Sequence, residues 1–229
     1  MNKMKFKHLY VVVICLLLVT SVTNAQEDEL FGNLSVGKSF AGSGNWGYSS
    51  ALTYKHIFDE IGWRRLSGDF GTNYKYGVWG FKGGLSLQYT FDDEIVNSLE
   101  VRPWVGASLR NELINHLAMI QVGRLEWRNF FYDGVDNEAY IRTTFDVGFE
   151  YELHDLNLET WAVETGYTWY FLKDPAIGER YANSREFRFL FIKKLPKAKL
   201  IFGYKAEKFR EFDGEDHGAA HTIHLAVAL

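Results

Sequence analysis

The alternation of apolar with small or polar side chains over the last nine residues, 221–229, is the feature that most constrains the fold. Ile223, Leu225, Val227 and Leu229 all have the same parity in this segment. Successive side chains of a β-strand point to opposite faces. The segment therefore predicts a strand with one apolar side that continues to the last residue of the printed chain.

The same alternation runs through most of the chain after residue 30. In the segment 140–153 the odd-numbered side chains are apolar or Thr, whereas the even-numbered ones are polar, charged or Gly. The segment 161–171 repeats this pattern. One face of each predicted strand suits a lipid environment, and the other carries interleaved acids and bases, as the inside of a small membrane barrel does.

Strand-like runs separated by turn residues fill the chain. Several are more than twice the usual strand length in soluble proteins, about five or six residues. Because single-chain bacterial barrels have an even number of strands, we expect that one of the runs before residue 80 does not form a strand. The predicted fold is all-β, a single antiparallel transmembrane β-barrel of 10 or 12 strands. The eleven runs are 30–40, 46–57, 65–75, 79–91, 99–109, 117–131, 140–153, 156–171, 186–195, 199–209 and 221–229.

The start of the chain has the layout of a secretory signal peptide. Three lysines precede an apolar run, 11–19, and small residues follow up to Ala25. This run is too short to cross a bilayer as a helix, which needs about 20 apolar residues. We therefore predict a signal peptide over 1–25, cleaved near Ala25, and an outer-membrane β-barrel over 26–229. Cys15, the single cysteine, lies in the predicted signal peptide, so no disulfide is expected.

Composition agrees with a membrane barrel. The chain has 18 Phe, 13 Tyr and 7 Trp but only 3 Pro, and 21 Gly, while its mean hydropathy is negative. A high aromatic content with a negative mean hydropathy is expected when half of each strand faces lipid and half faces a polar interior. Removing residues 1–25 takes away three lysines and no acid, which changes the net charge from −4 to −7. An acidic chain of this kind argues against nucleic-acid binding.

Connection lengths predict an orientation. With the carboxyl end on the periplasmic side, the connections at 154–155 and 195–197 are periplasmic and short, as periplasmic turns usually are. The other connections then lie outside the cell, at 92–97, 133–138, 173–183 and 213–218. The predicted location is the outer membrane of a Gram-negative bacterium.

Short charged and aromatic segments in the second half of the chain resemble a known family. The segments that carry the resemblance are Arg124-Leu125-Glu126-Trp127-Arg128, the strand containing Arg142, Glu164-Thr165-Gly166-Tyr167, Ser184-Arg185 and Phe202-Gly203-Tyr204. They resemble the uncharacterised outer-membrane barrels of the domain of unknown function numbered 2490. The resemblance covers most of the mature chain and is clearest from about residue 99. It implies a fold and a location but no activity and no catalytic residue.

Charged residues of one parity are predicted to line the barrel lumen. A charge in a confined lumen is costly unless it is paired, so we expect networks of arginine and carboxylate groups that satisfy one another. The predicted role is structural, or passive transport of a small solute. The predicted lumen network consists of Arg65, Asp69, Lys82, Glu100, Arg102, Arg124, Glu126, Arg128, Arg142, Asp146, Glu150, Glu164, Arg188, Lys205 and Glu207.

Signatures of enzymes and metal sites are weak. The candidate residues are scattered, and His221 and His224 have opposite parity on one strand. The sequence contains no Gly-x-Ser-x-Gly, no His-Glu-x-x-His and no phosphate-binding glycine loop. We therefore expect no enzymatic activity, no cofactor and no metal. The scattered candidates are His116, His154, His217, His221, His224, Ser108 and Ser184.

Two alternative functions stay open at this point. An outer-membrane lipid-modifying or proteolytic enzyme would bring Ser, His and acid together at the rim. A secreted soluble β-sandwich or lipocalin-like binding protein would turn its apolar face inward. The expected partners are outer-membrane lipid, the barrel-assembly machinery during biogenesis, and possible small solutes, without nucleic acid. Aromatic residues expected in interfacial girdles are Trp46, Tyr48, Trp63, Trp79, Trp127, Phe130, Trp169 and Tyr170, while Trp104 has inward parity.

Overall fold

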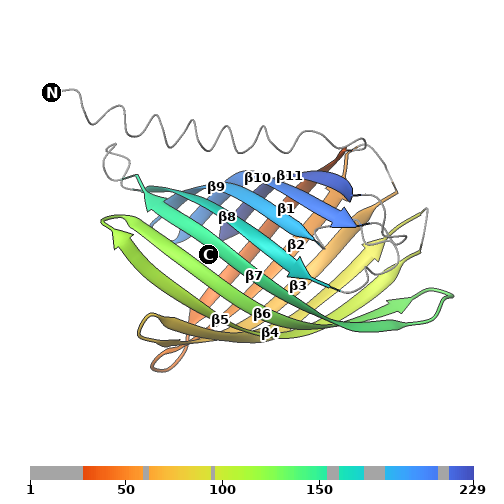
Figure 1. Ribbon diagram of the computed structural model, residues 1–229, viewed down its shortest axis with the longest axis horizontal. Helices are drawn as coiled ribbons and strands as arrows, with labels where there is room; N and C mark the ends of the chain where they lie inside the picture. The colour runs from red at the N-terminus through yellow and green to blue at the C-terminus, as the bar shows by residue number, and fades with distance from the viewer. Residues whose placement is uncertain (1–27, 59–61, 94–95, 154–159, 173–183, 211–216) are drawn as a thin grey trace.

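The computed structural model is a closed all-β barrel (Figure 1). It describes residues 28–58, 62–93, 96–153, 160–172, 184–210 and 217–229. Each strand pairs with its neighbours in chain order, and the last strand also pairs with the first. The strands are β1 (Asp28–Ala41), β2 (Trp46–Ile57), β3 (Arg64–Tyr76), β4 (Trp79–Phe91), β5 (Ser98–Ile114), β6 (Leu117–Tyr132), β7 (Glu138–Glu152), β8 (Trp161–Phe171), β9 (Arg185–Leu195), β10 (Ala198–Arg210) and β11 (His217–Ala228).

The predicted count of 10 or 12 strands is wrong, because all eleven runs form strands among the described residues. Neighbouring directions alternate around an all-antiparallel ring, so such a ring needs an even number. Here β1 and β11 run parallel instead, over ten residue pairs from Asp28 opposite Ala219 to Gly37 opposite Ala228. This one parallel contact allows the odd number, and we call it the seam.

The two ends of the barrel differ in their connections. At one end, tight turns at 42–45, 77–78, 115–116 and 196–197 join the strands, and we call it the short-turn end. Gly44, Gly77 and His116 adopt positive φ angles in these turns. The β7–β8 connection, 153–160, is at the same end and is longer than the predicted turn at 154–155, because β8 begins only at Trp161. The connections 58–63, 92–97, 133–137, 172–184 and 211–216 join strands at the opposite, long-loop end. In Figure 1 the β5–β6 turn lies on the left and the β6–β7 connection on the right.

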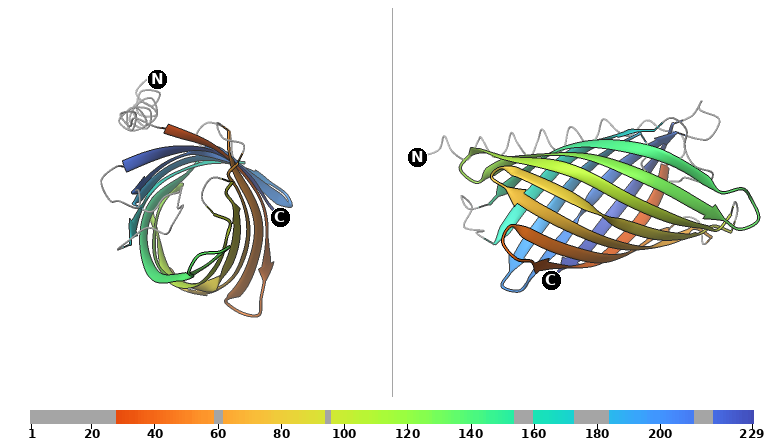
Figure 2. Two further views of the ribbon diagram at one scale, coloured as in Figure 1. Left: turned by 90° about the vertical axis from the view of Figure 1, so that its right-hand side faces the viewer. Right: turned by 90° about the horizontal axis from the view of Figure 1, so that it is seen from below.

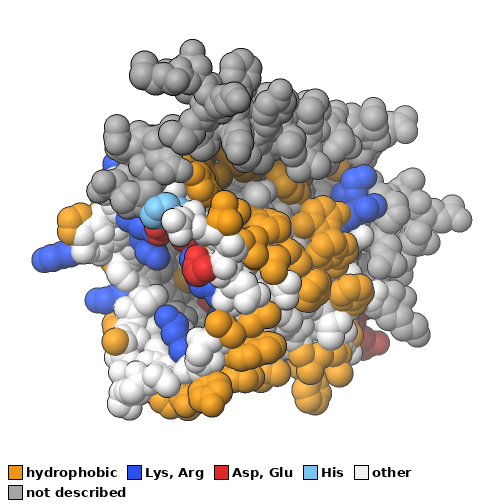
Figure 3. Space-filling model, turned by 60° about the vertical axis from the view of Figure 1, so that its left-hand side comes forward, with side chains coloured by type: hydrophobic (Ala, Val, Ile, Leu, Met, Phe, Trp, Pro, Cys, Tyr) orange, Lys and Arg blue, Asp and Glu red, His pale blue; other side chains and the backbone are white. Residues whose placement is uncertain are grey.

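The wall places apolar side chains outside and charged ones inside. Strand pairing gives one consistent outward set, which includes Leu34, Leu52 and Val105 with 55–59% of their surface exposed. Apolar side chains gather over the face shown in Figure 3, whereas the ring of strands encloses the interior in Figure 2. The predicted alternation is thus present with its apolar face outward, opposite to that of a soluble lipocalin-like binder. No helix among the described residues is long and apolar enough to cross a membrane.

The seam can be tested by cross-linking. Val36 on β1 lies opposite Val227 on β11, and both point outward. With Cys15 removed, the double variant Val36→Cys/Val227→Cys should form an intramolecular disulfide on oxidation, which changes the mobility of the boiled band on a gel. As a control, Val36→Cys/Leu200→Cys places the second thiol on β10, about 10 Å from β1 across two strand spacings, and should not cross-link. Equal cross-linking of the two pairs would contradict the parallel seam.

Candidate functional site

The candidate functional site is the interior of the barrel. The strand register places every residue of the predicted lumen network on an inward-facing position. Several of these charged side chains have less than a tenth of their surface exposed, among them Arg65, Glu100, Arg102 and Arg142. Such burial is tolerated only when hydrogen bonds and opposite charges compensate for lost water.

Glu100 on β5 lies between two guanidinium groups. Arg102 donates from Nε and Nη2 to its two carboxylate oxygens, both at 2.7 Å. Arg128 on β6 donates from Nε at 2.6 Å and from Nη2 at 3.2 Å. The Arg128 side chain is 0% exposed and the Glu100 side chain 2%. Two forked contacts of this type fix the geometry as well as the charge of the carboxylate.

Glu126 extends this arrangement across β6 and β7. Its carboxylate accepts a 2.6 Å hydrogen bond from Arg142 Nε and lies 2.9 Å from Arg124 Nε. Arg102 Nη1 is 3.9 Å from the same carboxylate and so links Glu126 to Glu100. We call these residues the lumen ion cluster: Glu100, Arg102, Arg124, Glu126, Arg128 and Arg142.

Aromatic faces lie beside the arginines, which outnumber the carboxylates in this cluster. The guanidinium carbon of Arg128 lies 4.8 Å from the ring centre of Phe130, and that of Arg142 lies 4.9 Å from Tyr170. Arg124 is 4.1 Å from the ring centre of Trp104. Cation–π contacts become stronger when water is excluded, so these rings compensate part of the excess positive charge.

Two apolar clusters lie near the long-loop end of the lumen. Phe130 and Tyr132 pack together with Tyr140 next to the lumen ion cluster. On the other side of the barrel, Phe31 and Trp63 meet edge to face at 5.2 Å and are almost completely buried. Large buried side chains therefore occupy part of the interior at this end.

Ion pairs also join strands on the seam side of the lumen. Lys55 on β2 bonds to Glu207 on β10 at 2.8 Å, which connects strands on opposite sides of the seam. Lys205 lies 3.2 Å from Glu186 on β9. Lys55 also sits 4.3 Å from the ring centre of Phe31, so this group of charges adjoins the apolar cluster at the long-loop end.

Glycines make room for large side chains that lie against the inner wall. Arg188 bonds to Asp146 and, at 2.8 Å, to Glu164, and its guanidinium crosses Gly166. A Cβ atom at Gly166 would come within 2.5 Å of Arg188 Cζ. The indole of Trp104 crosses Gly84 in the same way, where a Cβ would lie 2.7 Å from the ring. The inward position of Trp104 is explained by this contact and by its contact with Arg124.

Exposure of the lumen charges increases toward the short-turn end. There, Arg110 pairs with Glu112 and Glu150 at 3.1 Å, and its side chain is 46% exposed. Lys194 bonds to Glu152 at the same end, with both side chains more than a third exposed. The interior is thus densely packed near the long loops and more accessible at the short turns.

The predicted network is not one continuous set. Asp69 accepts a hydrogen bond from Ser86, and Arg65 Nε donates to Thr90 at 2.9 Å. Within the part of the chain that the structure describes, Lys82 has no carboxylate within ion-pair distance. The prediction omitted charged residues that the structure includes in lumen ion pairs. These residues all lie on inward positions, so the parity of their positions would have identified them. They are Lys55, Arg110, Glu112, Glu152, Glu186 and Lys194.

The girdle prediction is wrong for three residues. Trp63 and Phe130 are buried in the apolar clusters, and the Tyr170 hydroxyl points inward to Glu186 at 3.4 Å. Phe130 and Tyr170 share the parity of the inward charges on their strands. The remaining girdle candidates have 39–59% of their surface exposed on the outside: Trp46, Tyr48, Trp79, Trp127 and Trp169.

The described histidines occupy different places in the barrel. His221 points outward and hydrogen-bonds to Tyr204, while His116 lies in the β5–β6 turn, 3.7 Å from Glu152. His224 points inward, and its buried Nδ1 atom has no hydrogen-bond partner among the described residues. His154 and the side chain of His217 lie outside the described residues. No group of three or more possible metal ligands occurs within the described ranges.

The chain is similar to a solved porin structure. No family model matches the chain, so the resemblance to the domain of unknown function 2490 stays a prediction. No curated protein matches it. The anion-selective porin from Comamonas acidovorans is similar over 81% of this chain, with 14% identity and a TM-score of 0.36. The chain spans about half the length of that porin, 53%.

The lumen ion cluster predicts a stability effect. Arg128→Met leaves Glu100 with one arginine in a buried site and should lower the free energy of unfolding by about 3 to 5 kcal/mol. Urea unfolding of the folded barrel, followed by tryptophan fluorescence, measures this change. Arg110→Met removes a partly exposed pair and should change stability by less than about 1 kcal/mol. Equal effects of the two variants would contradict a structural role for the buried pair.

Proposed function

We propose that this protein is an outer-membrane β-barrel of a Gram-negative bacterium, with a lumen closed near its long-loop end by its own side chains. Its role is structural, or limited to slow passive passage of small solutes. The observation that carries the proposal is the inverted wall: paired charges such as Arg128 and Glu100 are buried inside, while large apolar side chains are exposed outside. A membrane supplies the apolar environment that such an exterior needs.

The distribution of outward aromatic residues supports the membrane location. One belt near the short-turn end contains Phe40, Trp46, Tyr48, Tyr76 and Trp79. A second belt near the long-loop end contains Trp127, Phe131, Trp169 and Phe171. Aliphatic residues such as Leu34, Leu52 and Val105 lie between the belts. Aromatic girdles of this kind mark the two membrane–water interfaces.

The proposed orientation has the short-turn end in the periplasm and the long-loop end outside the cell. Short periplasmic turns and longer external loops are usual in this class of barrel. The predicted signal peptide, 1–25, would direct export, and the barrel-assembly machinery would insert the chain. In this orientation the packed end of the lumen faces outward and the more accessible end faces the periplasm.

We propose no hydrolytic activity for this barrel. His224 lies beside Gly203 and Asn33 in the strand register and, within the described chain, its Nδ1 has no hydrogen-bond partner to orient it. A general base normally needs such an orienting contact and a nucleophile within hydrogen-bond reach. No observation favours the lipid-modifying or proteolytic enzyme as a second candidate.

The membrane location predicts a depth-dependent effect of charge on the outer face. Leu34 and Leu30 both point outward from β1, with Leu34 near the middle of the strand and Leu30 near the long-loop end. Leu34→Arg should destabilise the barrel in vesicles by about 2 to 4 kcal/mol, whereas Leu30→Arg should have an effect of about 0 to 1 kcal/mol. Reversible unfolding in lipid vesicles measures both. Equal effects at the two depths, or recovery of the mature chain as a soluble monomer without detergent, would contradict the location.

The closed lumen predicts low flux. Purified barrel in liposomes should release a small anionic or cationic dye hardly faster than empty liposomes. Arg128→Met should leave this rate almost unchanged, because Phe130, Tyr132 and Tyr140 still fill the same end. Heat-modifiable migration on a gel verifies that each protein is folded. High conductance that the Arg128 variant abolishes without loss of folding would replace this proposal with that of a selective conduit.

A further inference from the structure

The outer face of the wall carries few charges. Strand pairing places Lys38 and Lys193 on this face near the short turns, and Arg64, Arg185 and Lys208 on it near the long loops. Among the described side chains of the strands, these are the outward charges, and all are basic. Lys193 lies over Trp161 at 4.6 Å, and Arg64 over Phe91 at 4.9 Å.

Arg185 and Lys208 form a like-charge pair. They lie directly opposite each other on β9 and β10, and neither has an ion-pair partner among the described residues. Like charges directly opposite each other in a sheet destabilise it. At the edge of a membrane, where water is depleted, the repulsion increases. A bound anion would offset the repulsion between the two side chains. The pair therefore indicates that a ligand at this place would be negatively charged.

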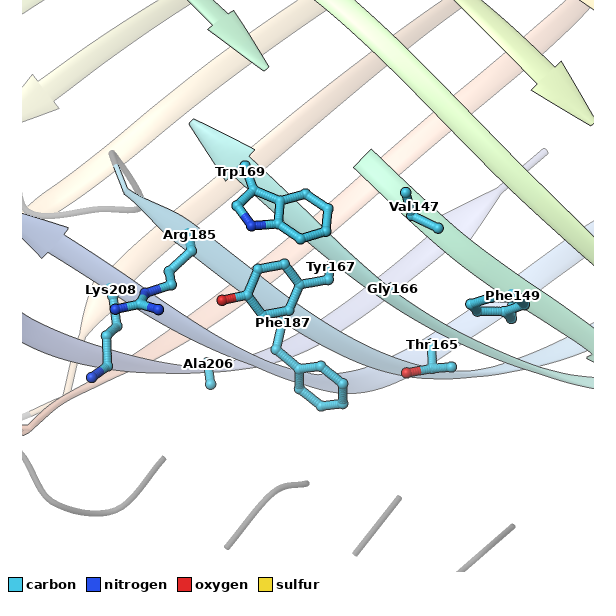
Figure 4. A pocket seen from close by; sticks show the side chains of 10 residues that line it. All are labelled: Val147, Phe149, Thr165, Gly166, Tyr167, Trp169, Arg185, Phe187, Ala206 and Lys208. Carbon is cyan, nitrogen blue, oxygen red and sulfur yellow. The ribbon is translucent and has the colours of Figure 1, made fainter. Parts of the chain in front are cut away.

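An apolar groove leads away from this pair along the outer wall (Figure 4). It has a volume of about 530 Å³ and is open to the outside. Aromatic side chains of β7, β8 and β9 line it, including Phe149, Tyr167 and Phe187. Thr165 also lines the groove and is much smaller than these rings. Figure 4 shows Arg185 and Lys208 together at one end and Phe149 and Val147 at the other.

We propose that this groove binds a lipid with a phosphorylated headgroup from the outer leaflet, with an acyl chain between the aromatic rings and a phosphate between Arg185 and Lys208. The inference rests on the proposed membrane location and orientation. Arg185 begins β9 and Lys208 lies near the end of β10, so both occupy the headgroup level at the long-loop end. Trp169 of the aromatic belt lines the groove at the same level.

The chemistry of the two ends matches one amphiphilic molecule better than a free ion. Guanidinium and ammonium groups both donate charge-assisted hydrogen bonds to phosphate oxygens, and guanidinium can do so in a forked geometry. The apolar lining provides no hydrogen bonds or charges that would bind inorganic phosphate. An acyl chain, by contrast, gains contact with aromatic side chains that lie fixed against one another, as Tyr167 and Trp169 do with ring centres 4.7 Å apart.

The test measures binding of diphosphoryl lipid A to the purified mature barrel in phosphatidylcholine nanodiscs, by native mass spectrometry over a lipid titration. Arg185→Gln/Lys208→Gln should weaken binding by about tenfold or more, the effect expected for losing hydrogen bonds between charged groups. Lys38→Gln/Lys193→Gln makes the same change in charge at the opposite rim and should leave binding within about twofold of the wild type. Thr165→Trp fills the groove without changing charge and should also weaken binding.

Three results would overturn the proposal: equal losses in both double variants, equal binding of fully dephosphorylated lipid A, or unchanged binding after Thr165→Trp. Displacement of the lipid by millimolar inorganic phosphate would likewise assign the pair to free anions. Each variant is first checked for heat-modifiable folding and insertion into vesicles. Failure of the wild-type barrel to insert overturns the membrane location and this inference together, whereas normal insertion with any of the listed results overturns this inference alone.

Discussion

The contact of Glu100 with Arg102 and Arg128 is the interaction on which the interior of this barrel depends. A narrow ring of strands has to fill its centre with side chains, and alternation makes half of each strand polar. Charged groups can occupy that space only if each is held by an opposite charge or a ring face. Glu100 and Glu126 satisfy this condition for four arginines, which brings β5, β6 and β7 together from the inside. The exposed apolar outer face is the other consequence of the same alternation.

Much of this architecture could be predicted because parity is a local property of the sequence. The face of Ile141 or Arg142 follows from its neighbours alone, and all eleven runs were visible. Ring closure is not local. Nothing in the segments around Leu34 or Leu225 indicates whether two strands far apart in the chain run parallel, and the general rule of even strand numbers favoured the wrong answer.

The sequence could not show which charged residues form ion pairs with each other inside the lumen. Parity places Glu126 and Arg142 on the inner face, but their pairing depends on the register between β6 and β7. The link between Lys55 and Glu207 joins residues separated by 152 positions and requires the ring to be closed. In contrast, the errors at Phe130 and Tyr170 were avoidable, since Phe130 shares the parity of Arg128 on β6 and Tyr170 shares the parity of Glu164 on β8. Alternation therefore gives a better criterion for the face of an aromatic residue than its residue type does.

The seam places a further demand on the alternating pattern. Every other strand pair is adjacent in the chain, and tight turns set the register of several of them. The strands β1 and β11 meet with no connecting turn, so no tight turn sets which of their residues lie opposite each other. A slip of one residue would turn one whole strand over, so that Leu34 and Val36 would enter the charged interior or His224 would leave it. Correct closure of the barrel therefore depends on β1 and β11 both alternating outward apolar side chains with inward small or polar ones. A substitution that weakened this alternation in either strand would impair barrel assembly.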